Sequence, residues 1–478
     1  MMRSLYSGVS GLRVHQTKMD VIGNNISNVN TVGFKASSAS FSDILYQTSK
    51  SASGPNATTG TAGTNAMQVG LGANLASITT SITKTGGSQR TDNPFDLMIE
   101  GDGFFVVNNG AGNFFTKAGS FNVDAAGTLC TPTGATVMGW EPSQVDKTKT
   151  VSGTVKPLRV MTPDNLYSAP EATTDIYLHG NIDSMDSNLT LPTGRIVNMS
   201  FFDDIGNSYT AELKINQSEI KELYKVTIQN IYDRNGDSIF VKENKDPETG
   251  DITYEASNIT DFSFGSGSGS VTVNEDGSLT VECDEIDLKF NGGNGNFVSV
   301  GDDSDDATSI KFKVNADPDP FKEINIDFSS ITMYNNSGTT TVESTKGTKD
   351  TGSGAGKEAG NMSGISVDQQ GMIFGTYDNG DRKLLGQVVV ATFSNPAGLE
   401  AIGNNMFAAT PNSGEFNGVG EDITSSGGKF ITGVLEMSNV DLSQQFTDMI
   451  TTQRGFQANS RIITVSDTML EDLINLKR

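Results

Sequence analysis

The chain has 478 residues, enough for two to four domains, and its 57 acidic residues outnumber its 33 basic residues to leave a formal net charge of −24. Such a charge disfavours negatively charged partners, so we expect no nucleic acid and no anionic membrane surface among its partners. Hydrophobic residues make up 35% of the chain, with 53 glycines and one tryptophan, which favours a mainly β protein with many turns. The sequence lacks a run of about 18 apolar residues, so we expect no membrane insertion.

The N-terminal segment, residues 1–35, is predicted to form a helix that ends at Gly33-Phe34. Its N-terminus has no continuous apolar stretch and no small-residue cleavage site, so a cleaved secretory signal is not expected. The helix is amphipathic because apolar residues recur at steps of three, four or seven, namely Leu5, Val9, Leu12, Met19, Ile22, Ile26 and Val29.

The middle of the chain has the pattern of β structure. Residues 36–90 and 411–438 are rich in small and polar residues and predict extended linker chain or weak β structure, serving as hinges or as passive spacers. Strand patterns separated by turns assign 91–169 and 361–410 to an inner β domain. Residues 170–360 form an insertion of one or two further β domains. Within it, residues 171–350 hold 13 Lys and Arg against 33 Asp and Glu, a net charge of −20 that favours exposure to solvent.

The C-terminal segment, residues 439–478, is predicted to be a long helix with two apolar stripes. The first stripe repeats every seven residues, as in a coiled-coil seam, through Leu442, Met449, Phe456, Ile463 and Leu470. Its expected partner positions are Phe446, Gln453, Ser460, Asp467 and Ile474, three of them polar. The second stripe comprises Ala458, Ile462, Val465, Met469, Leu473 and Leu476.

Two apolar stripes on one helix imply packing partners on two sides. We therefore predict that the terminal helices form an inner coiled-coil-like layer of a polymer and that nested β domains lie between them in the chain. A helix pair with a single seam is marginal, so both termini are expected to be largely disordered in the monomer and to fold on assembly. The alternative is an intramolecular helical hairpin that caps the β core.

Residues suited to catalysis are scarce, and we predict that the chain is not an enzyme and has no cofactor and no metal. Its two histidines are His15 and His179, and the two cysteines, Cys130 and Cys283, have neither a disulfide pattern nor metal-ligand spacing. The acidic loops 233–238 and 302–306 lack the glutamate of a calcium-binding loop, which favours solvated turns.

Several sequence stretches resemble the signatures of one family, the bacterial flagellar rod and hook proteins. They are SLYSGVSGL at 4–12, NNISNVNTVGFK at 24–35, DLMIEGDGFFVV at 96–107, KAGSF at 117–121, LEMSNVDL at 435–442 and QRGFQAN at 453–459. Within that family the length, the large insertion and the stretch QVVVATFSNPAGL at 387–399 are more similar to hook members than to rod members.

The resemblance implies a structural subunit that polymerises with copies of itself into a flexible curved tube. This tube would act as a universal joint that transmits torque from the rod to the filament. The implied partners are the flagellar rod at the proximal end, the hook cap during growth, the hook–filament junction protein at the distal end and the flagellar type III export apparatus. The implied location is extracellular, in the flagellum. A distal rod subunit and an extracellular adhesive or glycan-binding β protein are the alternatives.

The resemblance also implies which residues make contacts between subunits in the inner tube. They are the apolar residues of the two terminal helices, namely Leu5, Val9, Leu12, Met19, Ile22, Ile26, Val29, Leu442, Phe446, Met449, Phe456, Ile463, Leu470 and Ile474.

Overall fold

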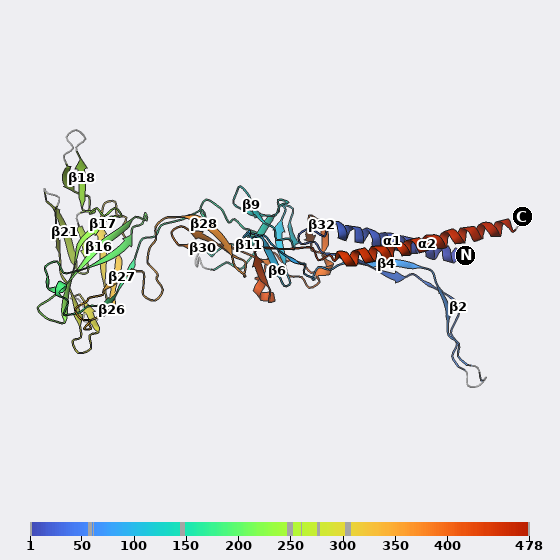
Figure 1. The fold of residues 1–478 in the computed structure, drawn as a ribbon, viewed down its shortest axis with the longest axis horizontal. Coiled ribbons are helices and arrows are strands. Elements are labelled where there is room, and N and C mark those ends of the chain that lie inside the picture. The colour runs from blue at the N-terminus through green and yellow to red at the C-terminus, as the bar shows by residue number, and fades with distance from the viewer. Residues whose placement is uncertain are drawn as a thin grey trace. The chain divides into compact units, whose positions relative to one another are not determined.

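A computed structural model describes residues 2–55, 60, 62–143, 149–245, 252–259, 261–274, 278–301 and 307–476 of the chain. The predicted acidic loop at 302–306 lies outside these residues. The chain divides into two compact units. The first unit comprises Met1–Leu166, Ser363–Thr376 and Arg382–Arg478, and the second comprises Tyr167–Met362 and Tyr377–Asp381. The fold is mainly β with a helix near each end of the chain, which confirms the predicted fold class at that level (Figure 1).

The two terminal helices, α1 (Met2–Ser27) and α2 (Leu442–Asn475), pack against each other in the first unit (Figure 1). Asp441 caps the N-terminus of α2, and its carboxylate accepts hydrogen bonds from the free backbone N–H groups of Ser443 and Gln444. After α1 the chain turns at Gly33, whose φ of +70° favours glycine. A Cβ at Gly33 would lie 2.7 Å from the backbone nitrogen of Ala118, so the turn is also too close to its neighbour for a larger residue.

Strands within residues 37–50 and 67–80 form a long β-hairpin, here called the arm hairpin. Strand β1 (Ser37–Asp43) pairs antiparallel with β4 (Ala73–Thr80), and β2 (Tyr46–Lys50) pairs with β3 (Met67–Gly70) beyond them. Hydroxyl groups face each other across β1 and β4, for example Ser40 and Ser77 with their oxygens 2.7 Å apart. Both β1 and β4 also contact α1, so the hairpin is attached to the helix at one end.

The rest of the first unit is built on a sheet with the order β29-β30-β11-β7-β8-β33-β32. Its core is aromatic and contains Phe104, Phe115 and the single tryptophan, Trp140, whose indole N–H donates to the Gly153 carbonyl oxygen at 3.0 Å. Two short strand pairs, β5–β35 and β6–β34, lead back toward the helices. The strands of this unit are β5 (Ser88–Arg90), β6 (Leu97–Glu100), β7 (Phe104–Asn108), β8 (Asn113–Thr116), β9 (Asn122–Val123), β10 (Leu129–Cys130), β11 (Thr136–Trp140), β12 (Lys156–Pro157), β29 (Met372–Tyr377), β30 (Arg382–Val388), β31 (Val390–Ala391), β32 (Glu400–Gly403), β33 (Met406–Ala408), β34 (Lys429–Thr432) and β35 (Val434–Glu436), with 3-10 turns at Pro396–Gly398 and Ile423–Ser426.

The second unit contains two main sheets, with the orders β22-β21-β20-β25-β26-β14-β27 and β15-β16-β17-β23-β24. Buried and half-buried residues alternate along strands such as β16, as expected for sheets with one buried face. The buried faces of both sheets share a hydrophobic core that includes Leu178, Met199, Leu213, Phe312 and Phe328. Its elements are β13 (Tyr167–Ser168), β14 (Asp175–Asn181), a 3-10 turn (Ser187–Thr190), β15 (Arg195–Phe202), β16 (Ser208–Gln217), β17 (Leu223–Tyr232), β18 (Val241–Lys245), β19 (Ile252–Ala256), β20 (Asp261–Phe264), β21 (Gly267–Val273), β22 (Leu279–Cys283), β23 (Ile286–Phe290), β24 (Phe297–Val300), β25 (Ser309–Asn315), β26 (Ile324–Thr332), β27 (Glu343–Lys346) and β28 (Gly360–Val367), the last of which crosses into the first unit.

Candidate assembly surface

The seam between α1 and α2 is polar at several points along its length. The side-chain oxygens of Ser4 and Ser466 lie 3.4 Å apart, and the amide of Asn25 donates to Gln445 at 3.1 Å. Because residues early in α1 face residues late in α2, the two helices run antiparallel. Between these points Lys18 forms an ion pair with Asp448 at 3.5 Å.

Glycines allow the two helices to approach closely. A Cβ at Gly11 would lie 2.6 Å from the Asn459 amide nitrogen, and one at Gly455 would lie 2.7 Å from the His15 ring. A Cβ at Gly8 would lie 3.2 Å from Ile463. The seam is therefore made mostly by small and polar residues. Apolar periodicity does not indicate a seam of small and polar residues. The seam residues Ser4, Gly11, Lys18 and Asn25 nevertheless recur every seven residues in the sequence.

The predicted contact residues divide between the seam region and the surface. Ile22 is buried, nine more are half-buried, and the other four are exposed. The half-buried residues are Leu5, Leu12, Met19, Ile26, Val29, Met449, Phe456, Ile463 and Leu470. The exposed ones are Val9, Leu442, Phe446 and Ile474.

The partner positions expected for the α2 seam all lie at the surface, including Phe446, Gln453 and Ser460. The positions that are buried or half-buried there come one residue earlier, at Gln445, Thr452, Asn459 and Ser466. The expected register was wrong by one residue because hydrogen bonds and close packing, rather than apolar side chains, form that side of the seam.

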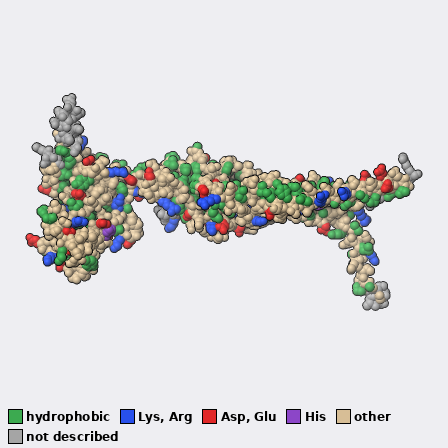
Figure 2. All heavy atoms as spheres, viewed as in Figure 1, with side chains coloured by type: hydrophobic (Ala, Val, Ile, Leu, Met, Phe, Trp, Pro, Cys, Tyr) green, Lys and Arg blue, Asp and Glu red, His purple; other side chains and the backbone are tan. Residues whose placement is uncertain are grey.

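The second apolar stripe of α2 is exposed. Val465, Met469 and Leu473 each retain about half of their accessible surface, at 51%, 49% and 54%. Hydrophobic side chains are visible on the surface of the paired helices and of the arm hairpin in Figure 2. Exposed apolar surface of this extent is typical of interaction sites.

His15 lies where α1, α2 and the arm hairpin meet. Its ring packs edge-on against Phe41 of β1, with the ring centroids 6.4 Å apart. Burial lowers the pKa of His15, and the positive charge of Lys18 lowers it further. Its Nδ1 atom is buried and finds no hydrogen-bond partner among the residues that the structure describes. The neutral imidazole is therefore the form that suits this position.

A buried ion pair connects the chain after α1 to the chain before α2. The Lys35 ammonium lies 2.7 Å from Oε1 of Glu436, and each side chain is only 1% exposed. Lys35 also donates to the Lys84 carbonyl oxygen at 2.8 Å, and the Gly86 backbone N–H donates to Glu436 at 2.9 Å. Burial and the neighbouring charge of Lys35 lower the pKa of Lys117 to about 8. Nothing in the periodicity of the sequence indicated this pairing.

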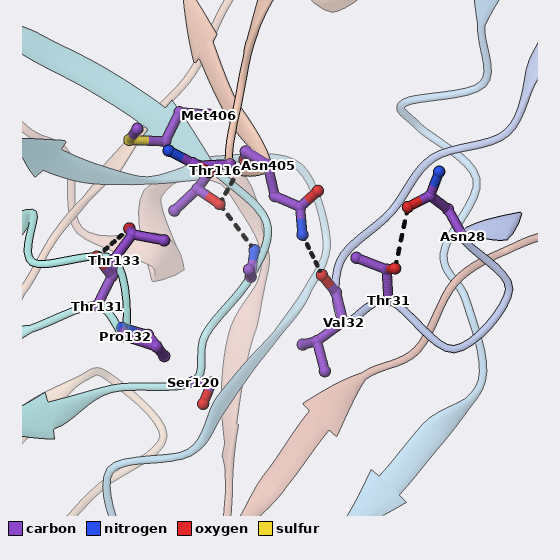
Figure 3. A pocket seen from close by; sticks show the side chains of 12 residues that line it. Asn28, Thr31, Val32, Thr116, Ser120, Thr131, Pro132, Thr133, Asn405 and Met406 are labelled. Atoms are coloured by element: carbon purple, nitrogen blue, oxygen red, sulfur yellow. Dashed lines mark hydrogen bonds between the residues drawn. The ribbon is translucent and has the colours of Figure 1, made fainter. Parts of the chain in front are cut away.

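A cavity of about 450 Å³ lies beside the turn that follows α1 (Figure 3). Asn405 donates to the Val32 carbonyl oxygen at 2.9 Å, and Thr116 donates to the Asn405 carbonyl oxygen at 2.8 Å. The residues lining the cavity are Asn, Thr, Ser, Ala, Val, Pro and Met, without a titratable side chain. These contacts hold the end of α1 on the sheet and offer no group for acid–base chemistry.

The candidate reactive groups of the sequence are divided between the two units, with His15 and Cys130 in the first and His179 and Cys283 in the second. Cys130 and Cys283 are free thiols, and burial raises the pKa of each. His179 contacts Thr345, with 3.2 Å between Nε2 and the hydroxyl oxygen. The 233–238 loop is a turn in which the Asp233 carboxylate accepts from the backbone N–H groups of Asn235 and Asp237. Within the described residues, no group of three or more His, Cys, Asp or Glu side chains is placed to hold a metal ion.

Among the described residues, neither α1 nor α2 is long and apolar enough to cross a bilayer.

Three family models match separate parts of the chain. The flagella basal body rod protein family matches residues 5–35, the hook protein FlgE/F/G D1 domain family matches 98–177, and the flagellar basal body rod FlgEFG protein C-terminal family matches 431–476. The first of these contains most of α1, and the last contains all of α2.

Curated relatives align over the whole chain. The flagellar hook protein FlgE of Borreliella burgdorferi is 34% identical, and that of Treponema pallidum is 35% identical, each over 100% of both chains. The flagellar basal-body rod protein FlgG of Bacillus subtilis is 27% identical over 100% of both chains.

Proposed function

The chain belongs to the flagellar hook protein family, and from this premise we propose that its paired terminal helices pack against those of neighbouring copies to form the inner layer of a tube. The chain is a structural subunit of the bacterial flagellar hook, a part of the flagellum outside the cell. The higher identity to hook relatives than to the rod relative supports the hook over the distal rod. The adhesive or glycan-binding alternative has no support from these relatives.

One observation carries the proposal that the helices make the contacts. The seam within one chain is formed mainly by small and polar residues, so most of the large apolar residues of both helices remain partly or fully exposed. Full burial of one such side chain contributes about 1.5–3 kcal/mol. Several of them along two helices supply a substantial driving force for association with further copies.

The proposed contact residues are the fourteen predicted from the sequence together with the exposed second stripe of α2. In this arrangement the helices stay docked while the β units slide past those of neighbouring copies, which lets the tube bend as a universal joint between rod and filament. The rod, the hook cap and the hook–filament junction protein are the proposed neighbours along the axis. Export through the flagellar type III pathway completes the proposal.

Deletion of residues 442–478 tests this function. The deletion starts after Glu436, because removal of Glu436 would leave the buried charge of Lys35 without a partner. We expect a soluble protein whose circular dichroism retains the β signal and whose sedimentation is that of a monomer. Electron microscopy should show tubes for the full chain and none for the truncated chain. Normal tube formation by the truncated chain would refute the role of α2.

A further inference from the structure

A groove lies between α1 and the base of the arm hairpin, with a cavity volume of about 470 Å³. Helix α1 lines it with Tyr6, Val9 and Arg13, and the hairpin lines it with Ile44, Leu71 and Asn74. We call these six residues the receiver groove. Tyr6, Val9 and Ile44 are exposed apolar or aromatic side chains, so the groove offers apolar surface to a partner.

The groove and the seam lie on different sides of α1. At about 100° per residue, Tyr6, Val9 and Arg13 point roughly half a turn away from Gly8, Gly11 and His15. The chain's own α2 covers the seam side and leaves the receiver groove free. A partner can therefore occupy the groove without displacing the helix pair.

Among the described residues, no helix of the same chain pairs with the end of α2. Since Ser4 faces Ser466 in an antiparallel pair, Met2 at the start of α1 reaches only about as far as Thr468. The residues beyond it, 469–476, extend past the N-terminus of α1, as Figure 1 shows at the ends marked N and C. Met469, Leu473, Ile474 and Leu476 are exposed on this overhang.

The two surfaces are complementary in charge. From Ile462 to Asn475, α2 carries three carboxylates, on Asp467, Glu471 and Asp472, and no Lys or Arg. All three are exposed, and Asp472 directly precedes Leu473 of the apolar stripe. The receiver groove presents the exposed guanidinium group of Arg13 beside its apolar residues.

We propose that the receiver groove of one subunit binds the C-terminal end of α2, residues 462–476, from a second copy of this chain. Apolar side chains of the stripe enter the groove, and Asp472 lies near Arg13 of the receiving copy. The contact joins two different surfaces, so a bound pair still has one free groove on one subunit and one free helix end on the other. A head-to-tail contact whose rotation does not close a ring adds further copies and builds an open helical assembly. This inference rests on the proposed function and specifies which surfaces meet.

Charge reversal tests the pairing of Arg13 with Asp472. Arg13→Asp and Asp472→Arg should each raise the protein concentration needed for tube formation about tenfold or more, which corresponds to a loss of one decade in affinity. The double variant should return that concentration to within about threefold of the value for the unmodified chain. Lys221→Asp and Glu282→Arg are matched reversals at exposed positions of the second unit and should leave that concentration unchanged. Failure of the double variant to recover would overturn the pairing.

A mixing experiment tests the head-to-tail geometry. Val9→Asp blocks the groove and Val465→Asp blocks the stripe, so neither variant should form tubes alone. An equimolar mixture should give dimers in analytical ultracentrifugation and nothing longer, because only one compatible groove and stripe remain per pair. Absence of dimers, or tubes from either variant alone, would overturn the proposal while leaving the hook function standing. Absence of tubes from the unmodified chain would count against the proposed helix contacts themselves.

Discussion

Lys35 and Glu436 are 401 positions apart in the sequence, yet their charged groups lie 2.7 Å apart in a site where each side chain is 1% exposed. The Glu436 Oε2 atom has no hydrogen-bond partner among the described residues, so the stability of this carboxylate depends largely on Lys35 and Gly86. The pair ties the chain that leaves α1 to the chain that enters α2.

Removal of either charge of this pair should therefore lower the free energy of unfolding. Glu436→Leu is expected to lower the free energy of unfolding by about 3–5 kcal/mol because it leaves a buried ammonium group without its carboxylate. The double variant Lys35→Met/Glu436→Leu should recover a large part of that loss. Urea denaturation followed by circular dichroism measures both.

The exposed pair Lys429–Glu100 is the matched control for the buried pair. Its side chains are about half exposed, and Glu100→Gln should cost no more than about 1 kcal/mol. Equal losses at the two sites would contradict a special role for Lys35 and Glu436.

Alanine substitutions at two glycines of α1 should change the stability of the helix pair differently. Gly23 has open space around it, so Gly23→Ala should stabilise the helix pair by about 0.5–1 kcal/mol through helix propensity. Gly11→Ala should give no such gain, or should destabilise the helix pair, because the added Cβ would meet the Asn459 amide. Thermal unfolding at 222 nm compares the two, and equal stabilisation would show that the seam is looser than described.

The stability of the helix pair should depend on pH through His15. Folding favours the neutral imidazole because burial and Lys18 lower its pKa from the usual value of 6.5. The stabilising contribution is therefore complete above pH 6.5, declines as the pH falls below that value and is lost once the pH is below the folded-state pKa. Melting temperatures between pH 4.5 and 8 should show this decline, and His15→Gln should flatten it, whereas His179→Gln should leave it in place.

The second unit should be sensitive to its own core without affecting the helices. Phe312 is fully buried against Phe201, Phe262 and Phe264, so Phe312→Ala should cost that unit about 3–5 kcal/mol. Hydrogen exchange should increase in β15–β26 and remain unchanged in α1 and α2. Ile205→Ala, at a residue that is 66% exposed, is the control and should leave exchange unchanged in both units. Increased exchange in the helices would show that the two units are not independent.

The sequence predicted the mainly β fold with a helix near each end, because apolar periodicity and turn residues are local properties. It also placed the family signatures, from which the hook function followed. The register of the seam could not be obtained in this way. Apolar spacing identified Leu442, Met449 and Ile463 but could not show that Gln445 and Ser466 face α1, since small and polar contacts carry no hydrophobic signal.

What the sequence determined by itself is the presence of apolar stripes on both terminal helices, which follows from residue spacing alone. Which of those residues are covered and which remain exposed was decided by the tertiary structure. Glycines at 8, 11 and 455 bring the helices together along a polar face, and the overhang of α2 and the receiver groove result from that particular register. The physical reason is that close packing depends on the shapes of two surfaces at once, whereas periodicity describes one helix at a time.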